Sequence, residues 1–221
     1  MKRFVAVSST SRFTKITSDS SSDRAVAAQL IAGEEKVLQW AESQGVDVVI
    51  LQPTLIYGWG MDKNVTQIAK FIRKFGFFPL LGKGNGLRQP VHVDDVATAC
   101  CSALEMTGRK TNQYILSGGE VLPYREMVER IFIALGKNPR FISCPLLFFS
   151  LAVRLARLIS FKGISTEMAV RMNRDQHFDN TQAAIDLGFH PRLFQPKSSD
   201  CIESVNTILE KGVGQDVKTS C

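Results

Sequence analysis

Residues 48–60 read Val-Val-Ile-Leu-Gln-Pro-Thr-Leu-Ile-Tyr-Gly-Trp-Gly, and this stretch decides which fold class the sequence predicts. Its first four residues form a short apolar run without alternation, which is typical of a strand buried on both faces of a parallel sheet. The proline and the two glycines that follow require a special backbone path, so the strand is expected to end there.

A second short apolar run, residues 4–7, lies upstream and predicts another buried strand. Between the two runs, residues 24–44 carry apolar side chains at helical spacing, and the charged residues 34–36 are expected to be exposed. Asp23 is expected to cap this helix and Gly45 to end it. A strand, a helix and a strand in this order imply a right-handed parallel crossover. The sequence therefore predicts an α/β protein with a parallel sheet.

Residues 86–97, Gly-Leu-Arg-Gln-Pro-Val-His-Val-Asp-Asp-Val-Ala, form the second informative stretch. They place Arg88 ahead of a short apolar strand, and Asp94 and Asp95 where a helix is expected to begin. An aspartate at a helix N-cap accepts hydrogen bonds from free backbone N–H groups, and a second acid suits the helix dipole. A guanidinium is a planar, permanently charged donor suited to phosphate. The stretch predicts an anion-binding arginine beside a capped helix.

Other elements follow from periodicity and from glycine and proline positions. We expect helices at 65–75, 94–105, 123–135 (with Pro123 as its first residue), 179–187 (capped by Asp179) and 197–210, and strands at 113–116 and 140–143. The glycine-rich residues 82–86 do not match a phosphate-cradling P-loop and predict a tight turn or hairpin.

Composition excludes several classes of protein. A chain of 221 residues with 44% hydrophobic residues can bury a core without a disulfide or metal staple. The net charge of +6 is spread along the chain without a basic run interleaved with aromatics, so nucleic acid is not an expected partner. No metal-ligand spacing occurs, and the three scattered histidines are expected to be structural.

Cysteines and apolar segments bear on location. The five cysteines include no CxxC pair, and Cys100 and Cys101 are adjacent on a predicted helix. We therefore expect no disulfide framework, and we expect the protein to reside in the reducing cytoplasm. The most apolar segment, residues 141–159, is interrupted by Arg154 and Arg157. We expect a buried or groove-lining helix there, with contact to a membrane surface as the minor alternative.

Four segments together resemble a known family: FVAVSST (4–10), QPTLIYGWG (52–60), RQPVHVDDV (88–96) and NQYILSGG (112–119). Their order and spacing resemble extended short-chain dehydrogenase/reductases, and more narrowly the NAD-dependent epimerase/dehydratase group that acts on nucleotide-diphosphate sugars. The resemblance covers residues 1 to about 195. It implies a Rossmann-like parallel sheet, of which this chain carries the second half, and a smaller carboxyl-terminal substrate lobe.

The resemblance also implies a division of the chain. Residues 1–120 would form the partial Rossmann-like domain, 121–211 a mainly helical substrate lobe interleaved with it, and 212–221 a tail. The implied cofactor is NAD or NADP, and the implied partner is a nucleotide-diphosphate sugar. The implied chemistry is hydride removal from a sugar carbon to the nicotinamide.

Several positions match functional residues of the family. Thr10, with Ser9, matches the catalytic hydroxyl, which hydrogen-bonds the reacting sugar oxygen. Pro53, with Gln52, matches the segment that lies against the nicotinamide.

The implied substrate residues lie further along the chain. Asn64 matches the asparagine that contacts the substrate diphosphate, and Arg88 matches the diphosphate-binding arginine. Arg171 and Arg174 are two alternatives for a second such arginine from the carboxyl-terminal lobe.

Two departures from the family pattern stand beside these matches. No GxxGxxG turn occurs, and the chain begins at what resembles the fifth strand, so we expect a fragment or a half completed by another chain. The family's proton-transferring Tyr and its Lys partner align, on Gly33-Glu34, with Val26 and Leu30, which transfer no proton. Tyr57 is the substitute base to consider.

Three interpretations follow. The first is an NAD(P)-dependent nucleotide-sugar epimerase/dehydratase-like protein that is truncated or catalytically impaired. The second is a non-catalytic binding or scaffold protein with the same fold. The third is a poorly stable product that forms homo-oligomers or aggregates through an exposed sheet edge.

Overall fold

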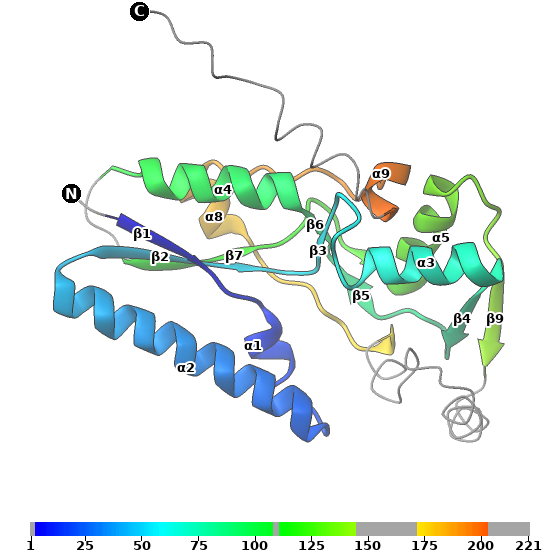
Figure 1. Ribbon diagram of the computed structural model, residues 1–221, viewed down its shortest axis with the longest axis horizontal. Coiled ribbons are helices and arrows are strands. Elements are labelled where there is room, and N and C mark those ends of the chain that lie inside the picture. The colour runs from blue at the N-terminus through cyan, green and yellow to red at the C-terminus, as the bar shows by residue number, and fades with distance from the viewer. Residues whose placement is uncertain (1–2, 108–110, 145–171, 203–221) are drawn as a thin grey trace, which may run out of the picture.

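The computed structural model describes residues 3–107, 111–144 and 172–202 of the chain. Its largest sheet has three parallel strands in the order β1 (Arg3–Val7), β2 (Asp47–Pro53) and β7 (Asn112–Leu116) (Figure 1). In register, Val5 lies beside Val49, and Leu51 lies beside Tyr114. The predicted parallel α/β sheet is confirmed.

Helices cover both faces of this sheet, which explains the unbroken apolar run in β2. Val48 and Ile50 pack towards α2 (Ser21–Gln44), whereas Val49 and Leu51 pack towards α4 (Val93–Glu105) and α8 (Thr181–Leu187) (Figure 1). All four side chains are fully buried. Alternate residues of a strand point to opposite faces, so a strand covered on both sides needs apolar residues at every position.

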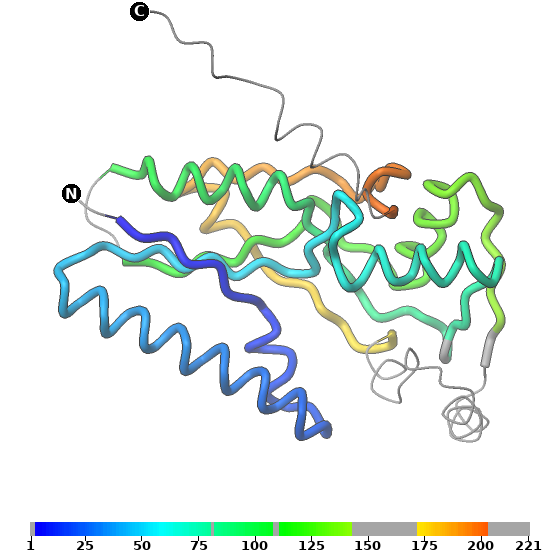
Figure 2. The backbone as a smooth tube through the Cα atoms, in the orientation of Figure 1, coloured from blue at the N-terminus to red at the C-terminus, as the bar shows by residue number. Residues whose placement is uncertain are grey.

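A second core lies beyond the carboxyl ends of these strands. Its helices and strands are α3 (Val65–Phe75), α5 (Tyr124–Ala134), α9 (Ser198–Cys201), β3 (Ile56–Tyr57), β4 (Phe78–Leu81), β5 (Leu87–Arg88), β6 (Val91–His92), β8 (Leu122–Pro123) and β9 (Phe141–Cys144). Tyr57, Phe78, Phe132 and Phe194 are among the buried side chains of this core. Figure 2 shows residues 172–202 running from beside β5 to α8 and back to α9. The division of the chain into domains stays a prediction.

Short strand pairings differ from the sequence-based expectation. The glycine-rich residues 82–86 form a turn, but no hairpin, because β4 pairs in parallel with β9 and β5 pairs antiparallel with β8. The residues that follow a turn do not specify which strand they pair with when the partner lies far along the chain.

Helix starts also differ from expectation. Asp23 lies inside the first turn of α2, where it accepts a hydrogen bond from Ser18 and pairs with Lys15. At α4 the N-cap is His92, whose Nδ1 accepts from the Asp94 N–H at 3.1 Å, and both aspartates lie in the first turn. A histidine ring nitrogen thus takes the role expected of an aspartate.

Smaller boundary shifts occur elsewhere. Pro123 is the N-cap of α5 instead of its first residue, and Asn180 is the N-cap of α8. Asp179 still satisfies the first turn of α8, because its carboxylate accepts from the Thr181 N–H at 3.1 Å and from its hydroxyl at 2.6 Å. The predicted helix 197–210 is only partly confirmed, because α9 ends at Cys201 and its C-cap Ile202 is extended. Residues 203–210 lie outside the described residues, as does most of 141–159. Over the described ranges, no helix combines the length and apolarity needed to cross a bilayer.

Candidate functional site

An open cavity of about 1700 Å³ lies at the carboxyl ends of β1 and β2. Parallel α/β sheets bind ligands at this edge. Of the side chains predicted to form a site, the cavity brings together Ser9, Thr10, Pro53, Tyr57, Asn64, Arg88 and Arg174. Gln52 is not among its lining residues, and Arg171 lies outside the described part of the chain.

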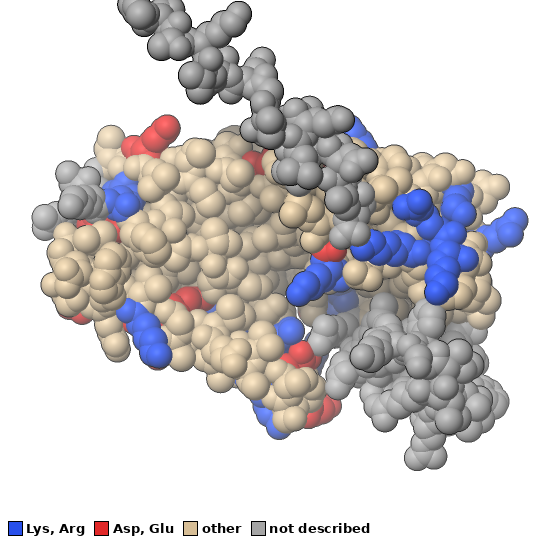
Figure 3. Space-filling view, viewed as in Figure 1, with Lys and Arg blue, Asp and Glu red and all other residues tan. Residues whose placement is uncertain are grey.

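The wall formed by α3 is cationic. Figure 3 shows Lys and Arg side chains gathered over α3, and Lys63, Lys70 and Lys74 of this region line the cavity. Positive side chains around a concave surface favour anionic ligands.

The hydroxyl of Thr10 is held against the end of β2. Its side chain is 5% exposed, its N–H donates to the Pro53 carbonyl at 3.0 Å, and its Oγ1 donates to the same carbonyl at 3.2 Å. Because that proton is committed to Pro53, the hydroxyl oxygen is available in the cavity as an acceptor. Thr10 is therefore placed to accept a hydrogen bond from a ligand hydroxyl.

Arg88 is a nearly buried cation in the cavity wall, with 3% of its surface exposed. Its Nη1 donates to the carbonyls of Leu87 at 2.6 Å and Arg174 at 2.8 Å, and its guanidinium lies 5.4 Å from the centre of the Tyr124 ring. These contacts orient the side chain, and its removal from water strengthens its attraction for an anion.

Asn64 stands at the start of α3 but does not cap it with its side chain. That role belongs to Asp62, whose carboxylate accepts from the N–H groups of Asn64 at 2.7 Å and Thr66 at 3.2 Å, and from the Thr66 hydroxyl at 2.6 Å. The exposed Asn64 side chain lines the cavity. Its amide can therefore serve a ligand.

Gln52 has a different environment from its neighbour Pro53. It is 2% exposed, and its Nε2 donates to both carboxylate oxygens of Glu34, at 3.2 and 3.1 Å. The expectation that Glu34 is exposed is therefore wrong, since it is 5% exposed and faces the sheet. The spacing of α2 does indicate that Glu34 faces inward. Glu34 lies seven residues after the buried Ala27 and seven before the buried Ala41, and a seven-residue step returns to the same face of a helix.

Tyr57 is a poor substitute base. Its ring is 1% exposed and packs edge-on against His92 and Phe194, with centroids 5.0 and 4.8 Å apart. Burial, with a smaller contribution from Asp200, raises its pKa above the ordinary tyrosine value. A base needs a pKa near the working pH, so the shift has the wrong direction. Neither Val26 nor Leu30 lines the cavity, and Val26 is 37% exposed.

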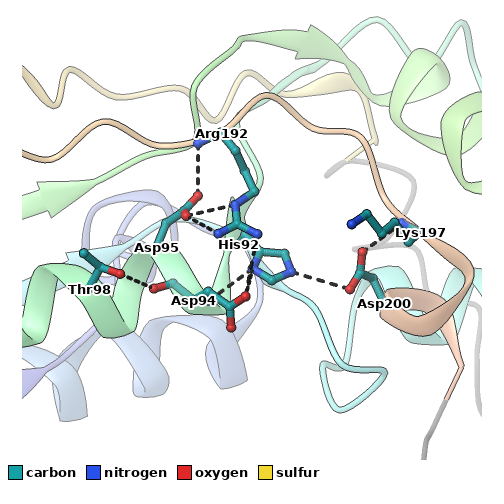
Figure 4. Close-up of polar contacts among 7 residues, drawn as sticks. All are labelled: His92, Asp94, Asp95, Thr98, Arg192, Lys197 and Asp200. Atoms are coloured by element: carbon teal, nitrogen blue, oxygen red, sulfur yellow. Dashed lines mark hydrogen bonds and ion pairs between the residues drawn. The ribbon is translucent and has the colours of Figure 1, made fainter.

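A polar cluster behind Tyr57 holds the start of α4 (Figure 4). His92 Nε2 lies 3.5 Å from Asp200 Oδ1, and the Arg192 guanidinium donates to Asp95 at 2.8 and 2.9 Å. These contacts join α4 to α9 and to the segment before it. The cluster is structural, as expected for His92.

The alkaline titration of tyrosines tests these environments. Burial raises the pKa of Tyr57, Tyr114 and Tyr124 above the ordinary value of about 10. The contribution of these protonated tyrosines to the free energy of unfolding is fully present below about pH 10. Above that pH the unfolded chain releases these protons first, so the free energy of unfolding falls by up to about 1.4 kcal/mol per pH unit per tyrosine. We expect absorbance at 295 nm at pH 10 to show far less tyrosinate in folded than in urea-unfolded protein; equal ionisation would contradict the burial.

Sequence comparison places the chain among known proteins. Residues 1–116 match the model of the NAD dependent epimerase/dehydratase family. The chain is 28% identical over 176 residues to the uncharacterized protein y4nG of Sinorhizobium fredii, covering 80% of this chain and 43% of that protein. It is 32% identical over 115 residues to the NADH dehydrogenase [ubiquinone] 1 alpha subcomplex subunit 9, mitochondrial, of Arabidopsis thaliana, covering 52% and 27%. The chain thus spans less than half the length of these curated relatives.

Solved structures show the same fold. UDP-glucuronic acid 4-epimerase from Bacillus cereus in complex with NAD aligns with a TM-score of 0.64 and 14% identity over 95% of this chain and 61% of that chain. MoeE5 in complex with UDP-glucose and NAD aligns with a TM-score of 0.63 and 21% identity over 95% and 66%. The family match spans more than half of the 221 residues. The chain therefore belongs to the NAD-dependent epimerase/dehydratase family.

Proposed function

We propose that this chain carries the sugar-nucleotide site of an NAD(P)-dependent epimerase/dehydratase-like protein, and that by itself it binds a nucleotide-diphosphate sugar without turning it over. One observation carries the proposal: the buried Arg88 and the cavity-lining Asn64 and Arg174 lie in the same cavity as Thr10. Cationic and amide donors suit a diphosphate, and a hydroxyl acceptor suits a sugar.

The ligand contacts follow from these positions. Arg88 and the Asn64 amide would donate to diphosphate oxygens, with Arg174 as the second arginine. Thr10 would accept from a sugar hydroxyl, because its own proton is directed to Pro53. MoeE5 was solved in complex with UDP-glucose and NAD, and the B. cereus protein is a UDP-glucuronic acid 4-epimerase in complex with NAD, which supports this class of ligand.

The residues present do not fit a complete dinucleotide. Pro53 lines the cavity where the nicotinamide would lie, but the Gln52 amide is committed to Glu34. No GxxGxxG turn occurs in the 221 residues to receive a pyrophosphate. We therefore assign no step of a reaction to this chain.

A non-catalytic binding or scaffold role is the second candidate. Val26 and Leu30, at the positions matched to the family's base and its partner, have no proton to transfer and lie outside the cavity lining. The name of the Arabidopsis relative describes a subunit of a larger assembly. Both observations fit a protein that kept the fold and lost the chemistry.

Calorimetry with UDP-glucose tests the proposal. We expect saturable heat with UDP-glucose and with UDP, and none with glucose, because the arginines and Asn64 would recognise the diphosphate. With NAD added, we expect neither NADH absorbance at 340 nm nor epimerised sugar. Absence of heat with any sugar nucleotide would favour the scaffold role, and turnover would contradict the predicted loss of catalysis.

We also propose that the protein is cytoplasmic and that it forms a homo-oligomer. β1 is the edge strand of the described three-stranded sheet, and its Phe4 and Val7 are 42% and 54% exposed. An apolar edge strand invites pairing with another chain. This feature supports self-association.

A further inference from the structure

Glu34 is a buried carboxylate, 5% exposed, at the centre of a polar network beside the cavity. Its Oε1 accepts from the Ser8 hydroxyl at 2.5 Å, its Oε2 pairs with the Arg12 guanidinium, and both oxygens accept from Gln52 Nε2. The Gln52 amide also donates to Gln113 Oε1 at 3.2 Å. The carboxylate thus joins α2 to the residue that follows β1, to α1 (Ser11–Thr14) and to β2, and Gln52 extends the network to β7.

The network holds both ends of the loop that carries Thr10. Ser8 directly follows β1 and donates its N–H to the Leu51 carbonyl at 2.7 Å, while Arg12 lies in the first turn of α1, after the loop. The residues between them include Ser9 and Thr10, which line the cavity. Movement at Ser8 or Arg12 would therefore displace the Thr10 hydroxyl from the Pro53 carbonyl.

Stability alone is a weak reason for a glutamate at this position. Burying a carboxylate is strongly unfavourable unless its oxygens are paired, and replacing buried ion pairs by apolar residues is often neutral or stabilising. The same face of α2 meets the sheet with Ala27 and Ala41, which are 0% and 2% exposed. A charged acceptor at Glu34 instead holds several hydrogen-bond donors in a defined geometry at the same time.

We propose that Glu34 is a positioning residue, which sets the orientation of the Thr10 hydroxyl in the cavity through Ser8 and Arg12. This inference rests on the proposed sugar-nucleotide site. Glu34 itself does not line the cavity, so it acts on a ligand only through the loop.

The matched pair Glu34→Gln and Glu35→Gln tests the proposal by binding. Both remove one negative charge from α2 at adjacent residues, but Glu35 is exposed. The new amide of Glu34→Gln would place a donor against the donors of Gln52 and Arg12, so we expect about tenfold weaker binding of UDP-glucose. Glu35→Gln is expected to bind as the unchanged chain does. Equal binding by both variants would overturn the proposal.

A double variant separates positioning from general destabilisation. If Glu34 acts through Thr10, then adding Glu34→Gln to Thr10→Val causes no further loss of affinity, because the hydroxyl that Glu34 positions is already gone. Additive losses would show that Glu34 acts on the whole fold, and would overturn the proposal.

Hydrogen exchange gives a readout that does not depend on a ligand. The N–H groups of Ser8 and Thr10 donate to the carbonyls of Leu51 and Pro53. In Glu34→Gln we expect them to exchange at least about tenfold faster, with unchanged exchange in α5. Unchanged exchange at Ser8 and Thr10, or equal acceleration throughout, would overturn the inference. If the unchanged chain does not bind UDP-glucose, the proposed function is overturned instead. The exchange result would then still decide whether Glu34 positions the loop.

Discussion

Replacing Arg88 by alanine is expected to weaken UDP-glucose binding by about 10- to 100-fold. A desolvated, charge-assisted hydrogen bond contributes roughly 1.5–3 kcal/mol, and Arg88 is 3% exposed in the cavity wall. The change also leaves the carbonyls of Leu87 and Arg174 without this donor and removes the contact with Tyr124. We therefore also expect a loss of roughly 1–3 kcal/mol in the free energy of unfolding.

Two further variants make the binding result specific. Arg73→Ala removes the same charge from an exposed position on α3 that does not line the cavity, and is expected to bind normally. Arg88→Lys keeps the charge without the planar fork, so we expect intermediate affinity. Calorimetry at a temperature where each variant is folded, as checked by circular dichroism, compares them. Undiminished binding by Arg88→Ala would remove Arg88 from the site.

Gly118→Ala is expected to destabilise the chain by about 3 kcal/mol or more. A Cβ at this position would lie 1.8 Å from the Pro90 carbonyl oxygen and 2.6 Å from its carbon. Both atoms are backbone, so no side-chain rotation relieves the overlap. The turn after β7 would have to move away from residues 89–90, breaking the Gly118 N–H to Gln89 carbonyl bond of 3.3 Å. Because Arg88 is next in the chain, its position in the cavity would shift as well.

Gly33→Ala is the matched control for this change. Gly33 lies inside α2, and a Cβ built on it meets nothing within 4 Å. Alanine restricts the unfolded chain more than glycine does, so we expect a gain of about 0.5–1 kcal/mol. Urea denaturation followed by circular dichroism measures both variants. An unchanged midpoint for Gly118→Ala would contradict the close approach of the two segments.

Local sequence patterns predicted the sheet, because they reflect the physical causes of strand and helix formation. The apolar run at 48–51 implies a strand buried on both faces, and β2 has helices on both sides. The run at 4–7 predicts a buried strand too, but this is wrong, because β1 lies at the edge of the described sheet with Phe4 and Val7 42% and 54% exposed. Helix 65–75 was placed correctly from apolar spacing and its basic last turn. The pairing of β4 with β9 could not be predicted, because short strands without alternation leave their partners undefined.

The site was predicted by residue type and family resemblance, and these do not determine environment. Thr10 and Arg88 line the cavity as expected, and their roles stay predictions. Residue type and resemblance also predict Gln52 and Tyr57 as site residues, but Gln52 is hydrogen-bonded to Glu34 and Tyr57 is buried against aromatic rings. Glu34 is charged like its exposed neighbours Glu35 and Lys36, so residue type predicts an exposed side chain, whereas the structure buries it.

Motifs in the sequence identified the family, and local patterns predicted the parallel crossover from residues 4–7 to 48–51 and the polar residues that follow these strands. Local patterns could do so because periodicity and turn residues act over a few neighbouring positions. Only the tertiary structure decided which polar side chains face the cavity and which face the interior. At the end of β2, Pro53 lines the cavity while Gln52 points to a buried carboxylate, because successive side chains of a strand leave opposite faces and α2 covers one of them.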